Sequence, residues 1–386
     1  MKEKYIDICI IGAGASGLAA AITAASQKGI STKESSILVI EKKDGPGKKI
    51  IASGNGRCNL SNANLPSWKD TSKFFESLGV VTMEESEGRL YPYSEDSKDV
   101  VRALENKCQE LGVNFEFSTC VESVEKQGNR FIVKTNKSIV TCKKLLIASG
   151  GKAAPKLGTI GDGYTFAKNL GHKVTKLVPV LTAIEANPRP EALKLHGVRA
   201  KAEAKLTYKN KELFAEKGEV QFIKDGLSGI CIFNMSRHLL VPEGKTYKDG
   251  FTDYKIYLDF APLMTEEELA KHFENLGEMP LCDKLNSLVK RPLALYLAEG
   301  TNSDLALARK LKNTEFQPTG AKGWDFAQVT KGGVSLDEIN KETMESLIVK
   351  NLYFSGEVLD YDGPCGGYNL ENAWSSGIKC GKGMTL

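Results

Sequence analysis

The sequence of 386 residues has little net charge and no long apolar run. Its 52 basic and 48 acidic residues leave a formal charge of +4. A balance this close favours neither a nucleic-acid groove nor binding to an anionic membrane surface. No stretch reaches the roughly 18 apolar residues that a membrane-spanning helix needs. We therefore expect no nucleic-acid partner and no membrane association.

Paired cysteines and clustered histidines are also missing. The nine cysteines include no CxxC pair, which argues against a zinc knuckle or a redox-active dithiol, and their odd number argues against a closed set of disulfides. The four histidines are not spaced as metal ligands. We expect no metal site, and free thiols as in cytoplasmic proteins. The apolar N-terminal run contains Asp7 and leads into a glycine loop, so we interpret it as a first strand and not as a signal peptide.

What the sequence does contain is a glycine loop between a predicted strand at 5–11 and a predicted helix at 18–25. In its GxGxxG spacing, Gly12 is expected to allow a tight turn, Gly14 the close approach of a pyrophosphate, and Gly17 close packing of helix on strand. A second strand at 36–40 ends in Glu41, whose carboxylate is placed to bind a ribose diol. The glycines alone are a weak signal, but the complete pattern predicts a dinucleotide site. A 2′-phosphate is disfavoured beside Glu41, so the nucleotide there is not expected to be NADP.

Two later segments repeat the pattern of a buried strand that ends in glycine. Residues 145–149 lead into Gly150 and Gly151 after a predicted β-meander at 114–140, and residues 352–355 lead into Gly356 and Glu357. A carboxylate at a strand end can bind ribityl hydroxyls. Because nucleotide-facing segments come from both ends of the chain, one long cofactor, FAD, is the economical interpretation.

The final helix, predicted at 371–380, opens after a polar, glycine-rich segment at 360–370. Backbone N–H groups near Asn369 and Leu370 are expected to stabilise negative charge on a reduced flavin. A fourth glycine-rich segment, residues 47–62, suits a loop that lies against pyrophosphate and flavin, although an ordinary surface turn is the alternative.

Three segments together resemble the BaiN/YhiN-like NAD(P)/FAD-dependent oxidoreductases, some members of which are described as aminoacetone oxidases. They are GKKIIASGNGRCNLSN (47–62), ASGGKAAPKLGTIGDGY (148–164) and LYFSGEVLDYDGPCGGYNLENAWSSG (352–377). The resemblance implies an α/β fold: a Rossmann-type, glutathione-reductase-like FAD-binding domain with an inserted β-rich middle domain and a small helical subdomain. The expected parts are 1–176 and 332–386 for the FAD domain, 177–260 and 313–331 for the middle domain, and 261–312 for the helical insertion. A capping box at Thr265 and Glu268 marks the start of the helical part.

Carried over residue by residue, the resemblance implies FAD contacts along the whole cofactor. It places Ala15 and Ser16 in the glycine loop, Glu41 and Lys42 on the adenosine ribose, and Val121 at the adenine. Together with the glycines, the predicted cofactor-binding residues are Gly12, Gly14, Ala15, Ser16, Gly17, Glu41, Lys42, Lys48, Lys49, Ser53, Gly54, Asn55, Gly56, Arg57, Val121, Gly150, Gly151, Gly356, Glu357, Gly367, Asn369 and Leu370.

The sequence departs from the family in its middle region. Many relatives carry a Phe-Thr-His-x-Gly-x-Ser-Gly-Pro motif, and here residues 222–230 read FIKDGLSGI, with Lys224 in place of the His and Ile230 in place of the Pro. An acid–base role of that His therefore does not transfer.

The catalytic candidates are Arg57, Cys58 and Tyr368. Arg57 could polarise a substrate carbonyl or bind a phosphate or a loop carbonyl. Cys58 could be redox-active or a small filler residue. Arg89 and Tyr91 could also reach the active cleft, or belong to a surface turn.

Three functions compete. The first is a reductase that takes a hydride from NADH or NADPH and delivers it through flavin N5 to a small or steroid-like unsaturated substrate. The second is an amine-type oxidase that uses O₂, and the third is a flavin-containing RNA-modifying or RNA-binding protein, which the charge balance disfavours. No second GxGxxG occurs in the middle region, so a nicotinamide would visit the flavin only transiently. We expect a reductase of a small molecule, acting as a monomer or homodimer.

Overall fold

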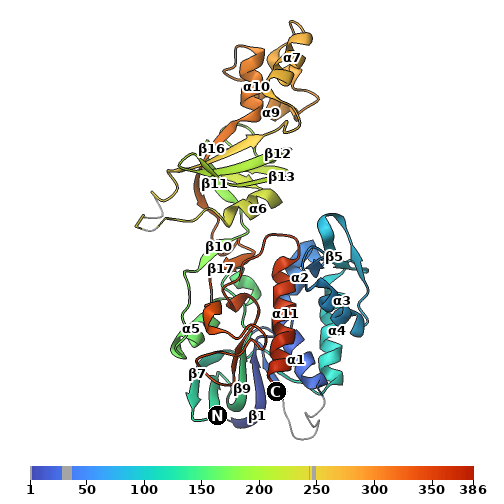
Figure 1. Ribbon diagram of the computed structural model, residues 1–386, viewed down its shortest axis with the longest axis vertical. Coiled ribbons are helices and arrows are strands. Elements are labelled where there is room, and N and C mark those ends of the chain that lie inside the picture. Colours follow the sequence, from blue (N-terminus) through green and yellow to red (C-terminus); the bar gives the residue numbers. More distant parts are fainter. Residues whose placement is uncertain (1, 28–36, 243, 246–248) are drawn as a thin grey trace. The chain divides into compact units, whose positions relative to one another are not determined.

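The computed structural model describes residues 2–27, 37–242, 244–245 and 249–386. They form two compact units: the chain up to Val178 together with Val329–Leu386, and Pro179–Gln328. The first unit therefore contains both ends of the chain, and Figure 1 shows the N and C labels in this unit. The sequence-based boundaries of the middle part lay after residues 176 and 331.

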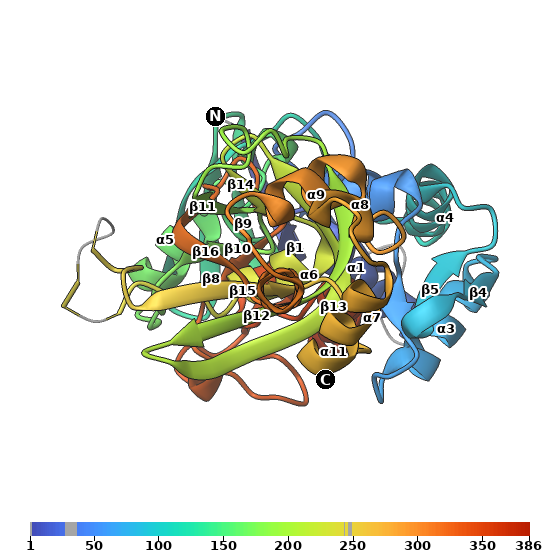
Figure 2. The same cartoon turned by 90° about the horizontal axis from the view of Figure 1, so that it is seen from above.

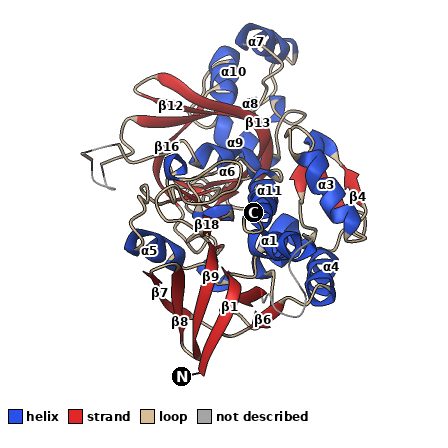
Figure 3. Cartoon of the chain, turned by 60° about the horizontal axis from the view of Figure 1, so that its bottom comes forward, coloured by secondary structure: helices blue, strands red, loops and turns tan. Residues whose placement is uncertain are grey.

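The first unit is built on a seven-stranded sheet, in which β18 pairs with β9 and the other strands follow the order β6-β2-β1-β9-β8-β7. The pairs β6–β2, β2–β1, β1–β9 and β9–β18 are parallel, whereas β9–β8 and β8–β7 are antiparallel (Figure 3). The strands are β1 (Lys2–Ile11), β2 (Ile37–Ile40), β6 (Asn114–Glu116), β7 (Val121–Gln127), β8 (Arg130–Thr135), β9 (Ser138–Ile147) and β18 (Leu352–Phe354).

This sheet confirms the predicted Rossmann-type α/β fold with its antiparallel meander. One detail differs: residues 114–116, predicted as part of the meander, form the parallel edge strand β6. Ser36, the first residue of the predicted second strand, lies outside the described residues. Strand β2 and the second half of β1 are buried on both faces, which is why their sequences are continuous apolar runs.

Helices and a small second sheet complete the first unit. Helix α1 packs against both α4 and α11, and the second sheet has the order β3-β5-β4. The remaining elements of this unit are α1 (Ala15–Ser26), α2 (Lys48–Ala52), α3 (Trp68–Ser77), α4 (Ser97–Glu110), α5 (Asp162–Asn169), α11 (Tyr368–Gly383), β3 (Ser61–Asn62), β4 (Thr82–Glu84), β5 (Arg89–Pro92), and the short 3₁₀ helices η1 (Ser53–Gly56), η2 (Ser86–Gly88), η3 (Pro155–Leu157), η4 (Leu336–Glu338) and η5 (Gly356–Val358).

The final helix, α11, begins earlier than the sequence predicted, at Tyr368 instead of Glu371. Its N-cap is Gly367, which has a left-handed backbone (φ 99°) and offers no side-chain cap. The sequence carries no Ser, Thr, Asp or Asn at this N-cap, and those residues are the usual signal of a helix start.

Helices α1 and α11 run parallel and in close contact. A Cβ atom on Gly377 would lie 2.3 Å from the Ser16 carbonyl oxygen, and one on Gly381 would lie 2.7 Å from the Ala20 carbonyl oxygen. Ser16 is the second residue of α1, and Gly377 is the tenth residue of α11. Helix α11 therefore starts eight residues earlier along the shared direction, which is about 12 Å at the usual rise per residue. Figure 1 shows the start of α11 extending past that of α1.

The second unit is a closed barrel with the order β11-β14-β13-β12-β15-β16. Figure 2 shows its two long strands, β12 and β13, side by side. The barrel strands are β11 (Ile184–Asn187), β12 (Arg199–Tyr208), β13 (Lys211–Ile223), β14 (Gly226–Ser228), β15 (Tyr254–Asp259) and β16 (Thr314–Ala321), and the helices of this unit are α6 (Ile230–Ser236), α7 (Glu266–Asn275), α8 (Leu281–Lys284), α9 (Arg291–Ala298) and α10 (Asp304–Lys312). Strand β17 (Val329–Lys331), which pairs with β10 (Val178–Val180), belongs to the first unit.

The predicted capping box at the start of the helical segment is confirmed. The Thr265 hydroxyl accepts a hydrogen bond from the Glu268 N–H (3.1 Å), and the Thr265 N–H donates to the Glu268 carboxylate (2.8 Å). Among the described residues, no helix combines the length and the apolar character that crossing a membrane requires.

Candidate functional site

Four parallel strands of the first unit end at the same edge of its sheet, and the loops that follow them meet there. The Gly12 N–H donates to the Ile40 carbonyl (2.8 Å), and the Ala148 N–H donates to the Ile11 carbonyl (2.9 Å). The Ser355 N–H donates to the Ile147 carbonyl (3.3 Å). In open α/β sheets this carboxyl edge is where ligands bind. The chain thus brings its first loop and a loop some 340 residues later to one place.

The three glycines of the first loop have three different surroundings. Gly12 has a φ of +109°, and a Cβ atom there would lie 2.4 Å from the Ala148 carbonyl oxygen. A Cβ atom on Gly17 would lie 2.0 Å from the Gly12 carbonyl oxygen. Around Gly14, by contrast, no described atom lies within 4 Å of the Cβ position. Turn, packing and open approach are the properties that a pyrophosphate-binding loop requires.

Helix α1 begins directly behind this open space. Its N-cap, Gly14, gives no side-chain hydrogen bond. Among the described residues, the N–H groups of Ala15, Ser16 and Gly17 have no acceptor. Unpaired N–H groups and the positive end of the helix dipole attract a phosphate.

Glu41 stands at the end of β2, as predicted, and both of its carboxylate oxygens accept backbone hydrogen bonds. Oε2 accepts from the Ala13 N–H and Oε1 from the Lys43 N–H, each at 2.8 Å. Each oxygen keeps a further lone pair, so the carboxylate can also accept from a ribose hydroxyl. Lys42, predicted on the same ribose, forms an ion pair with Asp162 at the start of α5. The Thr119 N–H donates to the Glu41 carbonyl (2.9 Å), which brings the chain just before Val121 alongside this site.

Glu357 lies at the same edge and joins the two ends of the chain. Its carboxylate forms an ion pair with Lys49 (2.6 Å) and accepts a hydrogen bond from the Thr330 N–H (2.9 Å). A Cβ atom on Gly151 would lie 2.4 Å from the Thr330 hydroxyl and 2.5 Å from the Glu357 carboxylate, so Gly151 permits this contact. The sequence did not indicate Thr330, because neither its residue type nor its spacing marks it. Lys48 pairs with Asp44 (2.8 Å), whose side chain is largely exposed.

Arg57, one of the catalytic candidates, is occupied by its neighbours. Its guanidinium pairs with Glu85 and with Glu95 (2.9 Å) and lies 4.1 Å from the centre of the Tyr91 ring. These partners fix Arg57 within the loop region that follows η1. Both ion pairs use Nη2, whereas Nε is buried and has no hydrogen-bond partner among the described residues, so the predicted role of Arg57 on a substrate carbonyl stays a prediction.

Cys58, the second candidate, is fully buried. Burial raises the pKa of its thiol to about 12. The thiolate, which is the reactive form, is therefore scarce at neutral pH. This environment favours the alternative interpretation of Cys58 as a small core residue.

The start of α11 holds Tyr368, Asn369 and Leu370. The Asn369 side chain accepts from the Gly363 N–H (2.8 Å) and donates to the Gly363 carbonyl (2.9 Å), so it fixes the preceding loop. The N–H groups of Tyr368, Asn369 and Leu370 have no acceptor among the described residues. This second uncapped helix start is thus open, like that of α1.

A set of hydrogen bonds ties the start of α11 to residues 59–62 near the other end of the chain. They run from Ser61 Oγ to Glu371 Oε2 (2.5 Å), from Asn62 Nδ2 to the Gly366 carbonyl (2.9 Å) and from Trp374 Nε1 to the Leu60 carbonyl (3.0 Å). When the side-chain amide of Asn59 is flipped so that its neighbours are satisfied, the Gly367 N–H also donates to Asn59 Oδ1 (3.1 Å). The Glu371 carboxylate is only 2% exposed and also accepts from Thr71 Oγ1 (2.8 Å). Sequence reasoning missed Glu371, since its burial depends on residues some 300 positions away.

These residues fit FAD. The cofactor carries negative charge on its diphosphate, and its ring gains negative charge when it is reduced. The chain supplies two open helix N-termini that point the same way, about 12 Å apart along their axes by the usual helical rise. An extended ribityl chain, with a phosphate at one end and the flavin ring at the other, spans a distance of this order. At the same edge lie the open space at Gly14 and the buried Ser149 hydroxyl, which has no hydrogen-bond partner in the part of the chain that the structure describes.

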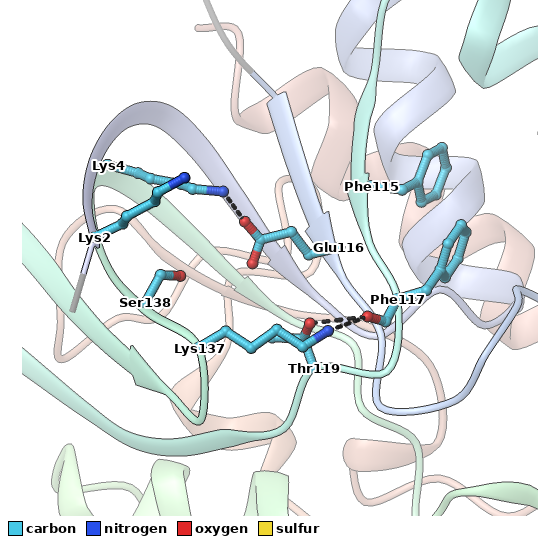
Figure 4. A pocket seen from close by; sticks show the side chains of 8 residues that line it. All are labelled: Lys2, Lys4, Phe115, Glu116, Phe117, Thr119, Lys137 and Ser138. Carbon is cyan, nitrogen blue, oxygen red and sulfur yellow. Dashed lines mark hydrogen bonds and ion pairs between the residues drawn. The ribbon is translucent and has the colours of Figure 1, made fainter.

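A separate pocket of about 340 Å³ also opens in the first unit (Figure 4). Figure 4 shows Lys4 paired with Glu116, and Lys137 donating to the Phe117 carbonyl. None of the predicted cofactor-binding residues lines this pocket. Its lining residues are Lys2, Lys4, Phe115, Glu116, Phe117, Thr119, Lys137 and Ser138.

In the second unit, the position where relatives carry a His is exposed. Lys224 lies between β13 and β14, and its ammonium is 3.7 Å from the carboxylate of Glu191, which is also exposed. No described cluster of His, Cys, Asp and Glu is arranged to hold a metal ion.

Two family models match the chain. The model of the HI0933-like protein Rossmann domain matches residues 67–383, and that of the NAD(P)-binding Rossmann-like domain matches residues 10–64. Together they take in the glycine loop, Glu41, Glu357 and the start of α11.

Similar proteins include two enzymes that match along nearly their whole length. The 3-dehydro-bile acid delta(4,6)-reductase of Clostridium scindens is 32% identical over 413 residues, covering 97% of this chain and 98% of that protein. The ribosomal RNA dihydrouridine synthase of Escherichia coli is 30% identical over 413 residues, covering 99% of this chain and 98% of that protein. Among solved structures, the 3-ketosteroid-delta4-(5alpha)-dehydrogenase of Rhodococcus jostii aligns over 100% of this chain and 98% of its own, with 13% identity and a TM-score of 0.50. The last likeness is one of fold.

Proposed function

The chain belongs to the HI0933-like family, and from this premise we propose that it is an FAD-dependent reductase of conjugated carbonyl compounds. It takes a hydride from NADH or NADPH and delivers it through flavin N5 to a carbon–carbon double bond conjugated with a carbonyl group. The family, together with the similarity to the bile acid reductase along nearly the whole chain, shows that the chain is an FAD-dependent oxidoreductase.

The observation that carries the proposal is the pair of open helix N-termini built from opposite ends of the chain. The start of α1 at Gly14 would hold the diphosphate, with Glu41 at the ribose. Lys49 and Glu357 would lie beside the ribityl chain, and the start of α11 would face the flavin ring. The bound flavin supplies the hydride transfer. The positive end of α11 stabilises the negative charge that the reduced ring carries.

The proposed substrate class follows from what the two sequence relatives are named for. One name describes reduction of a steroid with a 3-keto group and double bonds at positions 4 and 6, and the other describes formation of dihydrouridine. In both compounds the double bond that is reduced is conjugated with a ring carbonyl. We propose a small, steroid-like substrate first, because the net charge of +4 does not provide the basic surface that RNA binding requires.

Reduction of uridine in ribosomal RNA is the second candidate. The 30% identity with the dihydrouridine synthase over 99% of this chain favours it. The amine-oxidase alternative has no such support from the two sequence relatives, since both are named for a reduction or its product.

The proposal is tested by separating the two half-reactions under anaerobic conditions. The purified holoprotein is mixed with NADH or NADPH, and the loss of flavin absorbance is followed. The reduced protein is then mixed with a 3-keto-4,6-diene steroid, with an unmodified ribosomal RNA fragment, or with buffer. We expect bleaching by a nicotinamide and fast recovery of the absorbance with the steroid.

Each outcome decides between the candidates. Recovery with RNA alone would establish the second candidate in place of the first. Bleaching by aminoacetone, with peroxide formed when air is admitted, would replace both with an oxidase. A protein that binds no FAD from excess would overturn the proposal at its first step.

We further propose that the enzyme is a cytoplasmic monomer or homodimer. All nine cysteines are free, as expected in a reducing compartment. Light scattering of the eluted holoprotein, which gives its molar mass directly, tests the oligomeric state.

A further inference from the structure

Two arginines lie near the start of α11, and they differ in how firmly they are held. Arg57 is bound by two carboxylates and covers the Tyr91 ring. Arg89, at the start of β5, has one ion-pair partner among the described residues, Glu87. The Glu87 side chain is 72% exposed, whereas that of Arg89 is only 21% exposed. Exposed ion pairs of this kind contribute little, so a ligand can readily displace Glu87 from Arg89.

Arg89 also lies beside the open start of α11. Strand β3 pairs with β5 so that Asn62 lies opposite Arg89. A Cβ atom on Gly366 would lie 3.7 Å from Asn62 Nδ2, 3.7 Å from the Tyr368 ring and 3.8 Å from Arg89 Nε. Asn62 Nδ2 already donates to the Gly366 carbonyl (2.9 Å) and to the Glu87 carbonyl (3.1 Å), so it holds this segment in place. Arg89 and Tyr368 are the other two side chains that border this glycine. Gly366 lies one residue before the N-cap of α11.

We propose that Arg89 binds the carbonyl oxygen of the substrate, with Asn62 and Tyr368 bordering the same position at the start of α11. This inference rests on the function proposed above and names the residue that recognises the substrate class. The ligands it fits are planar, cyclic carbonyl compounds with a conjugated double bond. Arg57, which the sequence favoured for this role, is the more firmly held of the two arginines.

The chemistry explains why a cation is needed at this oxygen. When bound, FAD would supply a hydride for the carbon β to the carbonyl. The electron pair of the double bond would then move to the carbonyl oxygen, which Arg89 faces, and a proton from water would add to the α carbon. The substrate gains two electrons and two hydrogens, the flavin loses the two electrons, and NADH or NADPH restores them. Negative charge on the oxygen exists only after hydride addition. Arg89 and the positive end of α11 lower the energy of that state more than that of the bound ketone.

The test replaces Arg89 and measures the two half-reactions separately. In Arg89→Gln we expect unchanged FAD content and unchanged reduction by the nicotinamide, whereas transfer from the reduced flavin to the unsaturated ketone slows about 100-fold or more, the usual effect of removing one such donor. Arg89→Lys should restore part of the rate. The saturated ketone product should bind the variants only a few-fold more weakly, because the oxygen of the product carries no full charge.

Two matched controls accompany these variants. Glu87→Gln removes the partner of Arg89 and should leave the transfer rate equal or higher. Arg102 on α4 is 66% exposed and pairs with Asp99, so Arg102→Gln removes an arginine of the same unit without effect on either half-reaction.

The outcomes distinguish this inference from the proposed function. If the wild-type protein reduces no conjugated carbonyl compound, the proposed function itself fails. If the wild-type protein does so and Arg89→Gln transfers hydride at the same rate, only the role of Arg89 fails. Loss of FAD in both Arg89 variants, or slowed reduction by the nicotinamide alone, would also overturn it, because Arg89 would then serve the cofactor or the donor.

Discussion

Gly14 offers a test of the diphosphate site in which cofactor affinity should fall while the stability of the FAD-free protein hardly changes. Its backbone angles, φ −84° and ψ −171°, are those of an extended residue that alanine adopts freely. No described atom lies within 4 Å of the Cβ position. Within the protein, the one reason for glycine here is that it is a better N-cap than alanine. A ligand that approaches the backbone is the second reason.

The expected magnitudes follow from this geometry. In the FAD-free protein, Gly14→Ala should change the free energy of unfolding by less than about 1 kcal/mol, because alanine restricts the unfolded chain but is a poorer N-cap than glycine. In the complex, the added methyl group would occupy the space of the diphosphate. Overpacking of this kind costs about 1–3 kcal/mol. At 1.4 kcal/mol for each factor of ten, the dissociation constant of FAD should rise about 5- to 150-fold.

Two assays measure these quantities. Denaturant unfolding of the FAD-free protein gives the free energy of unfolding, and quenching of flavin fluorescence on titration gives the dissociation constant. Gly17→Ala is the matched control, since its Cβ atom would lie 2.0 Å from the Gly12 carbonyl oxygen and should destabilise the FAD-free protein itself. An unchanged FAD affinity in a stable Gly14→Ala protein would refute the assignment of this loop to the diphosphate.

Three further predictions concern contacts that only the folded chain makes. Gly377→Ala places a methyl group 2.3 Å from a carbonyl oxygen of α1, so it should lower the free energy of unfolding by about 1–3 kcal/mol despite the better helix propensity of alanine. The loss would be measured as a lower denaturant midpoint, and an unchanged midpoint would contradict the close packing. Ser61→Ala removes a hydroxyl that donates to the buried Glu371 carboxylate and should cost about 1–3 kcal/mol in the same assay, whereas Glu371→Gln together with Ser61→Ala should cost less than the two single changes added. Burial raises the pKa of the Cys58 thiol to about 12, so the stabilising contribution of the neutral thiol is complete below the unfolded-state pKa near 8.5 and is lost as the pH rises toward 12. Cys58→Ala should therefore weaken the fall of the free energy of unfolding with pH in that range. Rapid modification of Cys58 by a thiol reagent at pH 8 in the folded protein would count against its burial.

The sequence determined the parts of this protein that depend on neighbours along the chain. The apolar run, the glycine spacing and the acid at the end of the second strand were enough to predict the Rossmann-type sheet and to separate the surroundings of Gly12, Gly14 and Gly17. The capping box at Thr265 could be predicted for the same reason, since its two partners are three residues apart. Strand and helix periodicity and local capping need no knowledge of the rest of the molecule.

The tertiary structure alone decided which polar side chains are occupied and which are available. The sequence favoured Arg57 over Arg89, but Glu85, Glu95 and Tyr91 hold Arg57, while only an exposed Glu87 pairs with Arg89 among the described residues. The burial of Glu371 and the offset between α1 and α11 likewise depend on segments more than 300 residues apart. The physical reason is that the energy of a charge is set by the atoms that surround it in space, and those atoms come from segments whose meeting no local pattern records.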